Sequence, residues 1–70
     1  MLPLTYANVN EMNVIRQDGG NPEIKKHLED MGFVTGAVVT VVSAISGNLI
    51  VNVKDSKVAL DKQLAGKIMI

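Results

Sequence analysis

The sequence has no cysteine and no tryptophan, and its 70 residues include one tyrosine, one phenylalanine and two prolines. Without cysteine the chain has neither disulfide bonds nor thiolate zinc sites, so the core must stabilise the fold alone. The scarcity of aromatic side chains argues against base stacking and against the aromatic-lined grooves that bind proline-rich peptides. Because 47% of the residues are hydrophobic, the sequence predicts an aliphatic core.

No charge of either sign predominates. Seven basic and seven acidic residues cancel, which removes the attraction to phosphates or anionic lipid that basic proteins use. No apolar run approaches the roughly 18 to 20 residues that cross a bilayer, and Met1 to Leu4 lack the features of a signal peptide. We therefore expect a cytoplasmic protein with one domain over residues 1–70, no nucleic-acid partner and no insertion into a membrane. We also expect a monomer.

A helix is strongly marked after residue 20. Asn21 is an N-cap residue type, Pro22 suits the first helical position, and Glu23 places negative charge in the first turn. An apolar stripe follows at helical spacing, formed by Ile24, Leu28 and Met31. These signals predict an amphipathic helix that packs one side against the core.

The end of this helix is marked by Met31-Gly32-Phe33. If Gly32 is the first residue past the helix, Phe33 can fold back onto Leu28 in the contact that accompanies a Schellman ending. We therefore expect Gly32 to adopt a left-handed conformation and Phe33 to join the core.

The remaining chain alternates between β patterns and turns. The expected segments are a strand at residues 12–17 with its inward side undecided, a loop at 18–21, a strand at 38–45, a turn at 46–48, a strand at 49–53, a reversal at 54–57, a strand at 58–60, a helical turn at 61–65 and a strand at 67–70. The strand at 38–45 has apolar residues at both odd-numbered and even-numbered positions, which predicts a central strand covered on both faces for part of its length. The pattern favours a small, partly closed antiparallel barrel over the alternative of an open α+β sheet.

Several short motifs together resemble the FeoA family, the small cytoplasmic proteins of bacterial ferrous-iron uptake. They are the helix end Lys25 to Phe33, the turn glycine and valine strand from Gly36 to Val42, the Gly47 turn before Val51-Asn52-Val53, and the ending Ala65 to Ile68. The similarity lies in their order and spacing across nearly the whole chain.

This resemblance implies a mainly β fold with one or two short helices, a small SH3-like antiparallel β-barrel. It implies an accessory protein of ferrous iron uptake, with no enzymatic activity and no cofactor, that acts as a protein-interaction module on FeoB, a membrane Fe(II) transporter with a cytoplasmic GTPase domain. The module also resembles the C-terminal domain of DtxR-type iron-dependent repressors. Binding to another protein segment or to an iron-responsive regulator therefore stays an alternative, as does direct binding of Fe(II).

The candidate partner-binding residues are Lys25, Lys26 and His27, at the edge of the helix. The alternative is that they form a solvated helix face with no partner. His27 has Glu23 and Asp30 at helical spacing, a set that could hold Fe(II) or Zn(II), but the chain has no second histidine and no cysteine, so we expect no metal site. We expect no catalytic residue either, because no motif presents a hydroxyl nucleophile to His27.

Overall fold

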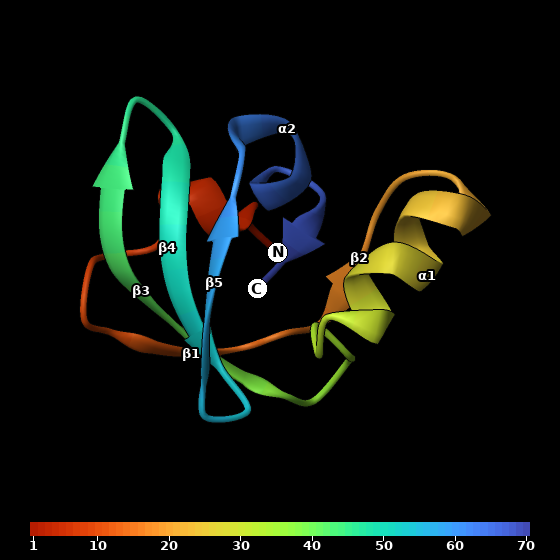
Figure 1. Cartoon of the computed structure of the whole chain (residues 1–70), viewed down its shortest axis with the longest axis horizontal. Helices are drawn as coiled ribbons and strands as arrows, with labels where there is room; N and C mark the ends of the chain where they lie inside the picture. The colour runs from red at the N-terminus through yellow and green to blue at the C-terminus, as the bar shows by residue number, and fades with distance from the viewer.

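A computed structural model describes residues 1–70 and is mainly β with two α-helices. The elements in chain order are the 3₁₀ helix η1 (Leu4–Tyr6), β1 (Met12–Val14), β2 (Gln17–Asp18), α1 (Pro22–Asp30), β3 (Val38–Ile45), β4 (Asn48–Val53), β5 (Ser56–Leu60), α2 (Lys62–Ala65) and β6 (Ile68–Met69). Strands β1, β3, β4 and β5 form one antiparallel sheet in that order, and β2 pairs with β6 in a second one (Figure 1).

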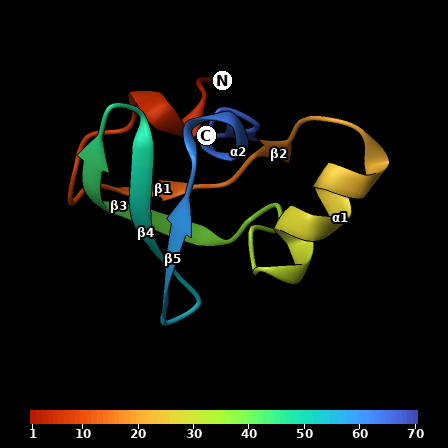
Figure 2. The same cartoon turned by 45° about the horizontal axis from the view of Figure 1, so that its top comes forward.

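One continuous segment joins the two sheets. The Ile15 N–H donates to the Ala37 carbonyl on the β3 side, while the next N–H, that of Arg16, donates to the Met69 carbonyl on the β6 side. The N-terminal segment extends the smaller sheet, because Leu2 and Ile70 exchange both backbone hydrogen bonds. The two sheets therefore wrap around one core, and the chain ends lie close together (Figure 2).

The passage of this segment from the larger sheet to the smaller sheet corrects two sequence predictions. The single strand expected at residues 12–17 is wrong, because the chain forms β1 and β2 with a break at Ile15 and Arg16. Asp18, expected in the following loop, lies in β2 opposite Ile68. The undecided inward side is now defined, since Ile15 is fully buried while Met12 and Val14 are exposed.

Both predicted reversals are tight β-hairpin turns, and the second is shorter than the expected 54–57 because Ser56 and Lys57 already belong to β5. Ser46 and Gly47 have φ of 53° and 83°, and Lys54 and Asp55 have φ of 48° and 62°, so two left-handed residues close each hairpin. The alternation expected in β4 is confirmed, with Leu49, Val51 and Val53 buried.

Strand β3 lies between β1 and β4, which confirms it as a central strand. Its inward face is buried at Val39 and Val41. The predicted coverage of both faces for part of the strand is found in its middle, where Thr40, Val42 and Ser43 are half-buried, while the end residues Val38 and Ile45 are exposed. The register of β3 shifts between Val41 and Ser43. This bulge explains part of the mixed placement of apolar residues, because the residues after it face the opposite side of the sheet from the one that simple alternation predicts.

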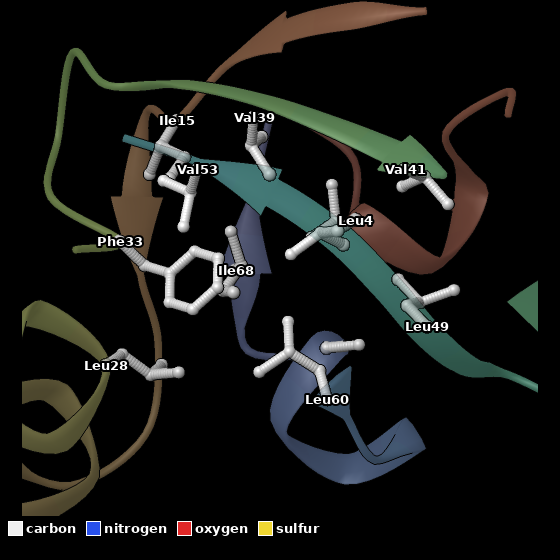
Figure 3. Close-up of a cluster of buried hydrophobic side chains, with 12 residues drawn as sticks. Leu4, Ile15, Leu28, Phe33, Val39, Val41, Leu49, Val53, Leu60 and Ile68 are labelled. Carbon is white, nitrogen blue, oxygen red and sulfur yellow. The ribbon is translucent and has the colours of Figure 1, made fainter. Parts of the chain in front are cut away.

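The core is aliphatic except for Phe33. Its twelve members are Leu4, Ile15, Leu28, Phe33, Val39, Val41, Leu49, Val51, Val53, Leu60, Ala65 and Ile68. Figure 3 shows the Phe33 ring between Leu28 of α1 and the barrel, close to Ile68. Phe33 therefore connects the helix to both sheets.

The two ends of α1 are built as the sequence predicts. The Asn21 Oδ1 accepts from the Ile24 N–H at 2.9 Å. At the other end Gly32 has φ of 102°, the Gly32 N–H donates to the Glu29 carbonyl at 2.9 Å, and the Phe33 N–H donates to the Leu28 carbonyl at 3.0 Å. This pair of bonds defines a Schellman ending. The helix projects from the barrel (Figures 1 and 2).

Two side chains hold the N-terminus of α2. Asp61 Oδ1 accepts from the Leu64 N–H at 2.8 Å, and Asn48 Oδ1 accepts from the Lys62 N–H at 2.9 Å. The Lys62 stem also covers Gly47, where an added Cβ would lie 2.8 Å from Lys62 Cγ. The β3–β4 hairpin is thereby fastened to α2.

We predict that Gly32→Ala lowers the unfolding free energy by about 1 kcal/mol or more, because it puts a Cβ on a left-handed residue. The nearest atom to that Cβ would be Lys54 Cδ at 3.5 Å, so the cost is conformational and not steric. Urea denaturation measures it. Gly32→Asn is the matched control and should lose less, since asparagine tolerates this conformation better. Equal losses in the two variants would contradict the argument.

We predict that Asn48→Ala costs about 1 kcal/mol, because it removes an acceptor from the first turn of α2. Thermal unfolding should show a midpoint lower by about 4 to 8 °C, the shift expected for a domain of this size. Asn8→Ala is the control, since the Asn8 side chain bonds only to exposed Glu11. A midpoint equal to that of the control would show that this bond does not stabilise α2.

Candidate partner-binding site

The three predicted site residues lie in the middle of α1. Lys25, Lys26 and His27 are all exposed, and their backbones are fixed by the capped ends of the helix. Successive residues turn by about 100° around a helix axis, so three in a row cover more than half of its circumference. The structure therefore places them on one exposed helix but does not bring them together as a single patch.

Lys26 points away from the stripe that packs on the core, and the other two lie on opposite flanks. Lys25 shares its flank with Glu29, one turn later, while His27 shares the other with Glu23 and Asp30. No group of three or more metal-ligating side chains is gathered here or elsewhere in the structure.

Sequence reasoning missed Asp18, the one buried charged residue. Its side chain is 8% exposed, and its Oδ1 has no hydrogen-bond partner. Burial raises the pKa of this carboxyl above its ordinary value, nearby Glu29 raises it further, and Lys25 partly lowers it. Asp18 therefore lies where the barrel meets the Lys25 flank of α1.

The burial of Asp18 follows from the pairing of its segment with the distant β6 segment, and the neighbouring residues in the sequence do not indicate it. A glycine pair follows Asp18, which by itself indicates a loop, but the Gly19 N–H donates to the Lys67 carbonyl at 2.6 Å and continues the pairing with the β6 segment. Only knowledge of this distant partner shows that the carboxylate turns inward.

An open cleft of about 990 Å³ separates α1 from the α2 region. Its lining residues are Ile24, Asp61, Lys62, Gln63, Leu64, Gly66 and Lys67. Two lysines and one aspartate give it a weak positive character. Ile24 is the only contributor from α1, so the predicted residues Lys25, Lys26 and His27 lie outside this cleft.

None of the helices is both long enough and apolar enough to cross a membrane. The longer one, α1, has nine residues, about 14 Å at 1.5 Å per residue.

The fold matches solved structures closely. A crystal structure of the iron uptake regulatory protein FeoA has 25% sequence identity and a TM-score of 0.86, covering 96% of this chain and 89% of that one. Stenotrophomonas maltophilia FeoA complexed with zinc, described as a prokaryotic SH3 domain protein, has 23% identity and a TM-score of 0.85, covering 99% and 88%. A manganese-dependent transcriptional repressor has 14% identity and a TM-score of 0.84 over 94% of this chain and 38% of that protein.

The fold is therefore a small SH3-like β-barrel with two short helices, which confirms the predicted class. The family model of the FeoA domain matches residues 2–70. The chain belongs to the FeoA family, which is linked to ferrous iron transport. No curated protein matches it in sequence.

We predict that Asp18→Asn stabilises the protein at neutral pH. The folded-state pKa of Asp18 is raised above its unfolded value, so the folded state holds the proton more tightly, and stability falls as the pH rises from below the unfolded pKa through the folded pKa. The amide stays neutral and does not lose this stability. The difference between variant and wild type should therefore grow from acidic to neutral pH.

Urea denaturation midpoints between about pH 4 and pH 7, the range above the ordinary carboxyl pKa, measure this effect. Glu11→Gln, at an exposed carboxylate, is the control and should follow the wild type. A variant less stable than wild type at neutral pH would show that the charged form of Asp18 stabilises the fold.

Proposed function

We propose that this chain is a cytoplasmic, non-enzymatic accessory protein of ferrous iron uptake, and that it binds the cytoplasmic region of the FeoB transporter as a monomer. Membership of a family linked to ferrous iron transport supports the process. The SH3-like fold supports the mode of action, because such modules serve in recognition and the function resides in their surfaces.

The observation that carries the proposal is the exposure of α1. This helix projects from the barrel and contributes only Leu28 to the fully buried core, with Ile24 and Met31 partly buried against it. Its other side chains are exposed. A charged helix whose outer side packs against nothing in the chain is available to a partner.

Lys25 and Lys26 are the residues that we propose to contact the transporter, with His27 beside them. Exposed lysines at the rim of an interface attract acidic groups of a partner, and salt weakens this attraction. Three carboxylates of the same helix, those of Glu23, Glu29 and Asp30, outnumber the two lysines, so the attraction depends on acidic groups that lie close to the lysines. The complementary surface on the transporter would be acidic.

We predict that the double variant Lys25→Glu and Lys26→Glu binds detergent-solubilised FeoB several-fold more weakly than wild type. The loss should come mainly from a slower association rate, and added salt should weaken the wild-type complex in the same way. Biolayer interferometry measures both rates. The matched control is Lys25→Arg with Lys26→Arg, which keeps the charge and should bind like wild type.

Lys25→Glu also brings a third carboxylate near Asp18 and Glu29, so the variant's folding must be checked by thermal unfolding. Lys26→Glu, which points away from Asp18, serves as a second variant. Unchanged association rates in both folded variants would remove these lysines from the interface. An absence of wild-type binding would overturn the proposed partner.

A further inference from the structure

Strand β5 forms one edge of the four-stranded sheet, and only β4 pairs with it. In both views of the molecule no strand lies along its other side (Figures 1 and 2). Ser56, Lys57 and Ala59 are exposed, so this side of β5 is open to solvent along most of the strand.

The opposite edge of the sheet, β1, is shorter, with three residues against five in β5. The segment that continues it is already covered, because the Arg16 N–H donates to the Met69 carbonyl. Strand β5 therefore offers the longer free edge.

The turn before β5 determines which of its backbone groups have no partner. A two-residue hairpin turn at 54–55 is closed by a hydrogen-bonded pair, here Val53 with Ser56. Bonded and non-bonded pairs alternate along an antiparallel ladder, so the backbone groups of Lys57 and Ala59 point away from β4. No backbone hydrogen bond outside the β4–β5 pairing involves either residue. The edge therefore presents two free N–H donors and two free C=O acceptors.

These backbone groups select an extended segment as the occupant of the edge. Alternating free donors and acceptors are complementary to the same groups of a second extended chain. A helix uses its own backbone groups internally and would leave those of the edge unpaired. In antiparallel register three residues of a partner segment suffice to exchange four hydrogen bonds with Lys57 and Ala59.

The side chains of β5 define which residues such a segment should carry. Lys57 and Ala59 lie on the outer face of the sheet, while Val58 is half-buried on the core side, opposite buried Val51. Opposite charges at directly facing positions stabilise a strand pair, and so do apolar pairs. The segment should therefore place an acidic residue opposite Lys57 and an apolar residue opposite Val58.

The other charged residues around this edge do not change that expectation. Two of them precede Lys57 in the turn, Lys54 and Asp55, and two follow the strand, Asp61 and Lys62. Their charges cancel within each pair, and Asp61 already caps α2. Lys57 is the only charged residue at a strand position of β5.

The same lysine disfavours pairing between two copies of this chain. The two-fold register that forms all four hydrogen bonds sets Lys57 of each copy opposite Ala59 of the other. The two lysines then become diagonal neighbours on one face, within reach of each other. Lysine on an edge strand is a common protection against such self-pairing, so a different chain with an acidic residue fits the edge better.

We propose that the β5 edge binds an extended segment of a partner protein as an added antiparallel strand, in which an apolar residue opposite Val58 directly precedes an acidic residue opposite Lys57. The inference rests on the proposed function, because the segment is assigned to the cytoplasmic region of the same transporter. The edge is a second contact, separate from Lys25, Lys26 and His27 on α1.

Amide hydrogen exchange of the full chain, measured residue by residue with and without detergent-solubilised FeoB, tests the edge. The N–H groups of Lys57 and Ala59 should exchange at least tenfold more slowly in the complex, because they gain acceptors there. The Val58 N–H is the internal reference and should change less, since its pairing with β4 already protects it.

Two pairs of variants test the same contact by biolayer interferometry. Ala59→Pro removes an outward donor without breaking the pairing with β4, a position where edge strands tolerate proline, and should weaken binding at least tenfold. Ala59→Ser keeps the donor and should stay within twofold of wild type. Lys57→Glu should weaken binding about threefold, and Lys57→Arg should not. Thermal unfolding checks that each variant is folded.

The outcomes separate this inference from the proposed function. Wild-type binding without slower exchange at Lys57 and Ala59 would overturn the edge and leave the proposed function standing, whereas no wild-type binding would overturn both. Exchange at these two residues that slows in the free protein as its concentration rises would overturn the partner segment in favour of a second copy.

Discussion

The structure depends on the left-handed turn at Gly32, which reverses the chain and sends Phe33 into the core. The helix and the barrel share few other buried side chains, because Leu28 is the only fully buried residue of α1. A chain of this size buries only about 60% of the surface that its unfolded form exposes, so one large aromatic ring contributes much of the contact between the two parts. The position of α1, and of every side chain it presents, follows from this turn.

The sequence predicts those parts of the fold that neighbouring residues determine. The Asn21 cap, the Gly32 ending, the Ser46-Gly47 turn and the Asp61 helical turn each arise within four residues, and each is found in the structure. The break between β1 and β2 could not be predicted in this way. It exists because Arg16 pairs with Met69, more than fifty residues later, and no local pattern encodes that pairing.

The candidate site also has one part that the sequence predicts and another that depends on distant segments of the chain. Sequence spacing places Lys25, Lys26 and His27 on the helix, where the structure has them, but it cannot tell which of them lies near the barrel. Lys25 is the one that lies near the barrel, because its charge acts on the carboxyl of Asp18 in β2. A buried carboxylate without a partner lowers stability, and such costs are common at functional positions.

The proposed contact depends on local charge. Lys25 and Lys26 share α1 with Glu23, Glu29 and Asp30, and charges act over about 8 to 10 Å in physiological salt, so a partner must present its acidic groups close to the lysines. The chain has a net charge of zero and no overall field to attract unrelated polyanions. Selectivity for a partner therefore comes from the position of the lysines on the helix.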